Sequence, residues 1–189
     1  MNKFRKKGKL VVIEGIDGSG KTTQTQLLIA RLREGGETVK SIKYPRHDTP
    51  FFGLMVDDYL NNRFGPAGEI NPYLASLLYA CDRWETKDQL NSWLKTGFWI
   101  VPDRYMTSNL GHQLGKIKST KEKEKFLQWE EELEFKTFDI PKPDLVVYLD
   151  ISINIVNKLL SKERQEDDKK YSQGKRDGHE TNINHLKNA

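Results

Sequence analysis

The sequence has little cysteine and no long run of apolar residues. Its single cysteine, Cys81, excludes an internal disulfide and the paired cysteines typical of zinc sites, so we interpret it as a small core residue. No apolar stretch approaches the ~20 residues that a transmembrane helix needs. The basic segment 3–9 also lacks the apolar stretch that follows such a segment in a signal peptide. We therefore expect a cytoplasmic protein with no membrane partner.

An excess of charge of one sign is also absent, because 31 basic residues are nearly balanced by 27 acidic ones. Much of the net charge of +4 comes from a basic N-terminal tail, residues 1–8, for which we expect no role. No basic patch of the kind that binds nucleic acid can be located, so we expect no nucleic-acid partner. The 189 residues fit one α/β domain that spans 1–189.

A glycine-rich segment, Gly15 to Thr22, organises the chain. It fits the pattern G-x-x-x-x-G-K-[ST] and lies between the apolar run 10–13 and the helix-forming segment 23–30. Such a loop turns backbone N–H groups toward phosphate oxygens, while its lysine adds a cation and its threonine offers a hydroxyl to Mg²⁺. The alternative is a strand-to-helix turn that matches by chance. The pattern predicts these ATP-binding residues: Gly15, Gly18, Ser19, Gly20, Lys21, Thr22 and Thr23.

The rest of the chain alternates strands and helices, which predicts an α/β fold with a central parallel sheet. We expect strands at 38–44, 98–101 and 144–150, the last of them buried, and helices at 51–60 and from 72 to about 94, with a break near Glu85. A charged helical region at 116–137 has Phe126, Trp129, Leu133 and Phe135 for a buried stripe, and its charges are interpreted as a solvated face. A short helix is expected at 153–161. Segment 162–176 has almost no apolar residues and is expected to be a mobile lid.

Several stretches together resemble the thymidylate kinases, P-loop enzymes that transfer the γ-phosphoryl group of ATP to dTMP. The resemblance implies the P-loop fold, ATP and dTMP as substrates, Mg²⁺ as cofactor and a homodimer. The family continues through a further helix, strand and helix, so we expect this sequence to lack the last strand and helix and the adenine contacts that they supply. The stretches that carry the resemblance are 14–24, 44–46, 77–83, 103–109, 141–145 and 177–180.

The resemblance implies that Tyr79 stacks on thymine and that Arg83 hydrogen-bonds a base carbonyl. The two residues are four apart on a predicted helix and so share a face. Without the resemblance, a core tyrosine and a surface arginine are the alternative. Ser108 and Asn109 match positions near the base edge, where Asn109 offers both a donor and an acceptor, and helix capping is the alternative role.

The phosphate groups have their own implied contacts. Arg104 matches the residue that holds the acceptor phosphate, and Asp103 matches the carboxylate near Mg²⁺, with a surface ion pair as the alternative. Asp17 corresponds to the acidic position near the 3′-hydroxyl of dTMP. Arg46 is expected on the acceptor phosphate, although a shift of one residue selects His47 instead.

The chemistry needs cations rather than a general base, because a phosphate monoester is already mostly ionised at pH 7. Lys21 and Arg104 are therefore the expected catalytic cations, together with Arg164 from the lid. The resemblance implies that the lid supplies a catalytic cation, because the phosphate-binding loop has Gly18 and Ser19 where some family members carry an arginine. A charged disordered loop is the alternative for the lid candidates, which after Arg164 are Lys169, Lys170, Lys175 and Arg176.

Two alternative functions remain open at this point. One is a kinase for another deoxynucleotide or for a deoxynucleoside. The other is a non-catalytic nucleotide-binding protein.

Overall fold

A computed structural model describes residues 7–152 and 154–156 of the chain. The lid 162–176 with Arg164, the tail 177–189 and most of the helix expected at 153–161 lie outside the described residues. Of the expected N-terminal tail, the structure describes Lys7 and Gly8, and the Gly8 N–H donates to the Leu94 carbonyl.

A four-stranded parallel sheet forms the centre of the molecule, which confirms the expected fold class. Its strands are β1 (Lys9–Gly15), β2 (Val39–Lys40), β3 (Trp99–Ile100) and β4 (Leu145–Leu149), in the order β2-β3-β1-β4. β1 is apolar and pairs along its whole length: Lys9 and Leu10 face β3, and the residues from Val11 to Gly15 face β4. Parallel pairing places the carboxyl ends of all four strands at one edge of the sheet.

Strands β2 and β3 are shorter than expected because Pro102 interrupts β3. Proline has no N–H, so it cannot donate to β1, and the regular ladder stops after the pair Leu10 and Ile100. Pairing with the β2 side nevertheless continues beyond the proline, because Asp103 N–H donates to the Ile42 carbonyl over 2.8 Å. Asp103 also forms isolated bridges with Ile13 and Lys43.

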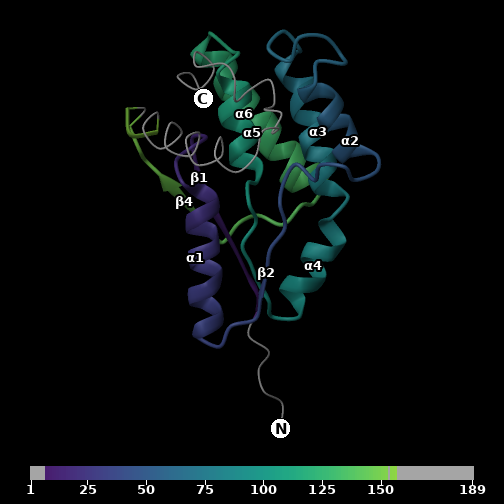
Figure 1. Cartoon of the computed structure of the whole chain (residues 1–189). Coiled ribbons are helices and arrows are strands. Elements are labelled where there is room, and N and C mark those ends of the chain that lie inside the picture. Colours follow the sequence, from purple (N-terminus) through teal and green to yellow (C-terminus); the bar gives the residue numbers. More distant parts are fainter. Residues whose placement is uncertain (1–6, 153, 157–189) are drawn as a thin grey trace.

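Helices surround this sheet, and Figure 1 shows α1 and α4 on its two sides and the other helices gathered beyond the carboxyl ends of the strands. The helix expected from 72 to 94 is broken near Glu85, as predicted, and Asn71 caps its start by accepting from Tyr73 N–H. The sequence analysis predicted no helix directly after Arg104, where α5 lies. The helices are α1 (Lys21–Glu34), α2 (Phe52–Leu60), α3 (Pro72–Trp84), α4 (Lys87–Lys95), α5 (Met106–Leu114) and α6 (Thr120–Glu131), which continues as a π-helix (Glu132–Thr137).

Two burial predictions are wrong. Strand β4 was expected to be buried, but Leu145, Val146, Val147 and Tyr148 are between 39% and 60% exposed, because β4 lies at the sheet edge and contacts mainly β1 among the described residues. Cys81 was expected in the core and is instead half-buried. Its partial burial still raises the pKa of the thiol to about 11, which keeps it protonated at neutral pH.

The charged face expected on the helical region 116–137 is also only partly solvated. Phe126 is buried as expected, but Glu130 and Glu134 are fully buried as well. The helix widens into the π-helix after Glu131, with Phe138 N–H donating to the Leu133 carbonyl five residues back. Glu130 lies four residues after Phe126 in the regular part of the helix and so shares its buried face. The wider turn that follows keeps Glu134, four residues further on, on the same inward side.

The inward-facing Glu134 forms a buried ion pair with Arg83 of α3. The Arg83 Nε lies 3.0 and 2.9 Å from the two carboxylate oxygens, and its Nη2 also donates to Glu134. Burial alone would lower the pKa of Arg83, but the Glu134 carboxylate outweighs it and the pKa is raised. The pair therefore joins α3 to the π-helix as two charges that stay ionised together.

We expect Glu134→Ala to lower the free energy of unfolding by about 3–5 kcal/mol, because it leaves the Arg83 guanidinium buried without its counter-charge. Urea unfolding monitored by circular dichroism measures the loss. Glu131→Ala is the matched control, since Glu131 is exposed on the same helix and should change stability by less than about 0.5 kcal/mol. Equal effects of the two variants would contradict this account of the ion pair.

Candidate active site

The turn between β1 and α1 has the backbone that a phosphate-binding loop requires. Gly18 and Gly20 have φ angles of 77° and 85°, which favour glycine. At Gly15 a Cβ atom would lie 2.5 Å from the Ser19 Oγ, so a larger residue would crowd the turn. The predicted ATP-binding residues Gly15, Gly18, Ser19, Gly20, Lys21, Thr22 and Thr23 thus lie together in this turn and the first turn of α1.

Lys21 is held at the centre of the turn. Its Nζ donates to the carbonyls of Gly15 and Ile16 over 2.7 and 2.9 Å and to the Asp17 carboxylate over 3.1 Å. Burial lowers the pKa of Lys21, and the neighbouring Asp17 opposes that shift. The ammonium group is therefore fixed where the loop would receive phosphate oxygens.

Asp17 links the loop to the acceptor side of the site. Its Oδ1 accepts a hydrogen bond from Arg104 Nη2 over 2.6 Å, and its Oδ2 lies 3.8 Å from His112 Nε2. Burial alone would raise the pKa of Asp17, but Arg104, Lys21 and His112 together bring it well below its usual range. Asp17 is therefore a carboxylate at neutral pH that gathers basic groups from three parts of the chain.

Arg104 adopts an unusual backbone conformation, with a φ of 68°. This left-handed residue separates the sheet position of Asp103 from the start of α5 at Met106. Backbone conformations of this kind cluster at functional sites.

The two residues predicted to hold Mg²⁺ lie next to each other. Thr22 Oγ1 is 3.5 Å from Asp103 Oδ2, although the residues are far apart in the sequence. A hydroxyl and a carboxylate oxygen fit Mg²⁺, which is commonly bound by one or two protein oxygens, with water and phosphate completing its shell. Among the described residues, no group of three or more His, Cys, Asp or Glu side chains could hold a metal ion.

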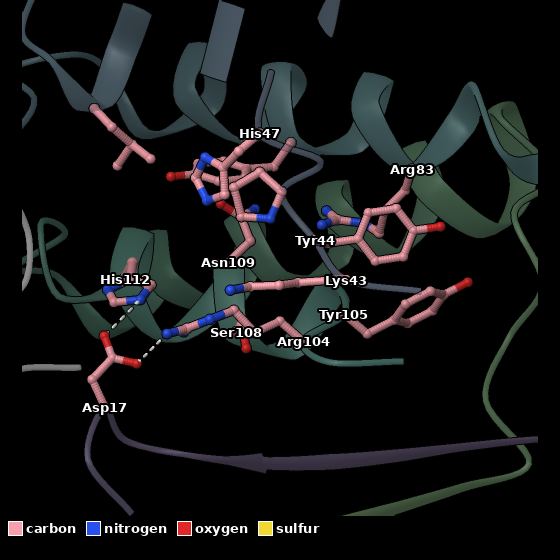
Figure 2. Close-up of a pocket in the computed structure, with 13 residues that line it drawn as sticks. Asp17, Lys43, Tyr44, His47, Arg83, Arg104, Tyr105, Ser108, Asn109 and His112 are labelled. Atoms are coloured by element: carbon pink, nitrogen blue, oxygen red, sulfur yellow. Dashed lines mark hydrogen bonds and ion pairs between the residues drawn. The ribbon is translucent and has the colours of Figure 1, made fainter. Parts of the chain in front are cut away.

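A cleft of about 110 Å³ extends from Asp17 and Arg104 toward α3, and Figure 2 shows its side chains. Lys43, Arg104 and His112 lie toward the Asp17 end, while Arg83 and two tyrosines, Tyr44 and Tyr105, lie toward the other. The cleft has a cationic end and an aromatic end. The predicted acceptor residues that line it are Asp17, Tyr79, Arg83, Arg104, Ser108 and Asn109, and the sequence analysis missed Lys43 and His112.

Contacts within the protein already engage some of these side chains. Ser108 Oγ donates to Glu14 over 2.6 Å, and Thr107 Oγ1 donates to the other oxygen of the same carboxylate. Tyr79 packs edge-on against Tyr59, with ring centroids 6.0 Å apart. Glu14, which the sequence analysis gave no role of its own, therefore fixes the first turn of α5 beside the cleft.

The family model described as thymidylate kinase matches residues 13–184. The chain belongs to the thymidylate kinase family. Members of this family are nucleoside monophosphate kinases.

Individual relatives agree with the family assignment. The chain is 32% identical over 154 residues to the thymidylate kinase of Plasmodium falciparum, covering 82% of this chain and 67% of the relative. It is 33% identical over 151 residues to that of Schizosaccharomyces pombe, covering 79% and 64%. The thymidylate kinase structure from Candida albicans superposes with a TM-score of 0.68 at 26% identity, covering 96% of this chain and 73% of that one. The matches thus span about two thirds of the length of the two sequence relatives.

Arg46 and His47 are placed differently relative to the cleft. Arg46 Nε donates to Asp82 over 2.9 Å and its Nη2 donates to Glu85, so its guanidinium is turned toward α3. His47 lines the cleft, and its Nδ1 contacts Asp57 of α2. This geometry favours His47 for contact with an acceptor nucleotide.

We expect Arg46→Ala to lower the free energy of unfolding by about 2 kcal/mol, because Asp82 is buried and would lose its charged partner. His47→Ala should change stability by less than about 0.5 kcal/mol and should instead raise KM for the acceptor nucleotide. Chemical unfolding and steady-state kinetics on both variants separate the two effects. A raised KM in Arg46→Ala and a loss of stability in His47→Ala would instead indicate that Arg46 contacts the acceptor nucleotide.

Proposed function

We propose that this chain transfers the γ-phosphoryl group of ATP to dTMP, producing dTDP with the help of Mg²⁺. The observation that supports this most directly is the cleft that runs from Asp17 of the phosphate-binding loop, past Arg104, to an aromatic end. In-line transfer requires the two nucleotides to meet at such a junction, with their charges neutralised. The use of ATP as donor and the lone cysteine fit a cytoplasmic enzyme.

On the donor side, Lys21 and the loop N–H groups bind the phosphates of ATP. Thr22 and Asp103 would hold Mg²⁺, which neutralises charge on the transferring group when bound. Gly15, Ile16 and Asp17 engage all three N–H bonds of the Lys21 ammonium, so binding of ATP exchanges at least one of these contacts for a phosphate oxygen. Arg164 of the lid is proposed as a further catalytic cation.

On the acceptor side, Arg104 binds the phosphate of dTMP, and Lys43 and His47 add positive charge or donors at the same end of the cleft. Asp17, held ionised by its neighbours, accepts a hydrogen bond from the 3′-hydroxyl. At the aromatic end, Tyr79 stacks on the base. Arg83, Ser108 and Asn109 surround the edge of the base.

We expect Lys21→Ala to lower kcat by about 10²–10³-fold, because the lysine stabilises charge on the donor phosphates, while dTMP binding persists. Lys118→Ala is the matched control, since Lys118 is exposed and away from the cleft. A coupled phosphotransfer assay with dTMP, dUMP, dGMP and thymidine measures both variants and the wild type. Activity on dGMP without activity on dTMP would contradict the thymine assignment, and tight nucleotide binding without turnover would indicate a non-catalytic nucleotide-binding protein.

We also propose a homodimer formed through α3. Leu74, Leu77 and Trp84 are exposed at helical spacing on one face of this helix, with the half-buried Cys81 between them. Exposed apolar stripes of this kind are typical of protein interfaces. Figure 1 places α3 on the far side of the molecule from α1.

We expect Leu74→Arg to convert the protein to a monomer in sedimentation velocity, because Leu74 is the most exposed of these apolar residues and a charge in its place is costly to bury in an interface. Leu27→Arg is the matched control, since Leu27 is exposed on α1. A wild-type protein that sediments as a monomer would refute the dimer, and dissociation by Leu27→Arg would place the interface elsewhere.

A further inference from the structure

The amide of Asn109 is held by two buried side chains. Its Nδ2 donates to Ser76 Oγ over 2.7 Å and to Glu130 Oε1 over 2.8 Å, so both N–H bonds of the amide are used. Its Oδ1 is buried and has no hydrogen-bond partner among the described residues. Asn109 lines the cleft, and this oxygen is the one amide atom that has no partner among the described residues.

Ser76 and Glu130 both accept hydrogen bonds from the amide nitrogen of Asn109. Both residues are fully buried, and they reach Asn109 of α5 from α3 and α6. Ser76 accepts from Asn109, and its side chain also lowers the pKa of Glu130. An ionised carboxylate only accepts, so a reversed amide would place Oδ1 against Glu130 with no hydrogen between the two oxygens.

We propose that Glu130 is a positioning residue which, with Ser76, fixes the Asn109 amide so that only its oxygen faces the base of the acceptor nucleotide. This inference rests on the proposed function of the cleft. An acceptor at this point selects a pyrimidine that carries a ring N–H, as thymine and uracil do at N3. It rejects cytosine, whose N3 is an acceptor and would leave two buried acceptors facing each other without a hydrogen.

The protonation state of Glu130 should control this selection. The charged or hydrogen-bonding groups that face Glu130 are Glu134 of the π-helix, Arg83 and Ser76 of α3, and Asn109 of α5. Burial and the Glu134 carboxylate raise the pKa of Glu130 to about 7, while Arg83 and the hydrogen bonds oppose the rise. The ionised group is an acceptor only, whereas the protonated group can donate its proton to a reversed amide.

The experiment compares kcat/KM for dTMP and dCMP in the wild type and in Glu130→Gln. The glutamine amide can both accept and donate, so it satisfies Asn109 in either orientation, and we expect the dTMP preference to fall about tenfold or more. Glu131→Gln is the control, because it makes the same change at an exposed neighbour and should keep the preference. Thermal melting of each variant identifies any general loss of fold.

Two further readouts distinguish positioning from a structural effect. Between pH 6 and 8.5 the wild-type preference should rise with pH, whereas that of Glu130→Gln should stay flat. Ionisation of the substrate phosphate affects dTMP and dCMP alike and cancels in the ratio. In an Asn109→Ala background, Glu130→Gln should cause no further loss of preference, because Glu130 acts through the amide.

An unchanged dTMP-to-dCMP ratio in Glu130→Gln, or additive effects in the double variant, would overturn the positioning role. If the wild type has no turnover with dTMP, the proposed function fails, and the ratio of Kd values for dTMP and dCMP from calorimetry then tests Glu130 by the same criteria. Binding of neither nucleotide would overturn both proposals.

Discussion

The site depends on the backbone pairing of Asp103 at the carboxyl edge of the sheet. Asp103 N–H donates to Ile42, and its carbonyl accepts from Tyr44 N–H over 3.0 Å, so the chain beyond Pro102 is tied to the end of β2. Its bridges to Ile13 and Lys43 bring three strand ends to one point. The phosphate-binding loop starts directly after β1. The pairing of Asp103 therefore brings Asp103 next to Thr22 and Arg104 next to Asp17. Without this backbone pairing, the loops at this edge could not keep the residues proposed to bind the donor and acceptor nucleotides in a fixed arrangement.

The second constraint is buried charge, which the molecule keeps in place by pairing. Asp17, Lys21 and Arg104 lie together at the loop, and Arg83, Glu130 and Glu134 lie together behind the cleft. Removing these groups from water is costly, and hydrogen bonds offset part of that cost: Arg83 donates to Glu134, and Asn109 donates to Glu130. The first cluster carries more cations than carboxylates, whereas the second is buried among helices, with Arg83 at the wall of the cleft. In the proposed site, the charged groups at one end of the cleft bind phosphate, and those at the other end hold neighbouring side chains in one orientation.

The features of the fold and the site that could be predicted from the sequence are those encoded by a few neighbouring residues. The strand–loop–helix turn at 15–22 and the break near Glu85 are encoded within a few residues, and the structure has both where the sequence predicted them. The inward position of Glu134 depends on a π-helical turn, and a sequence of mixed charges gives no sign of that change in helical phase. Helix α5 was missed because Gly111 and polar residues weaken its apolar pattern, although it is held by Glu14 from another element. Contacts between distant segments, such as Asn109 with Glu130, have no local signature.

Arg83 shows how a structural contact and a ligand contact can belong to one side chain. The resemblance assigned it to a base carbonyl, while the structure ties its Nε and Nη2 to Glu134, which considered alone would suggest a purely structural arginine. A guanidinium has five N–H groups in a rigid plane, so a carboxylate that grips one edge also orients the others. Nη1 has no hydrogen bond within the described part of the chain, and Arg83 lines the cleft. Glu134 therefore does for Arg83 what Glu130 does for Asn109: each buried carboxylate fixes one side of a planar group so that the opposite side is presented in a single orientation.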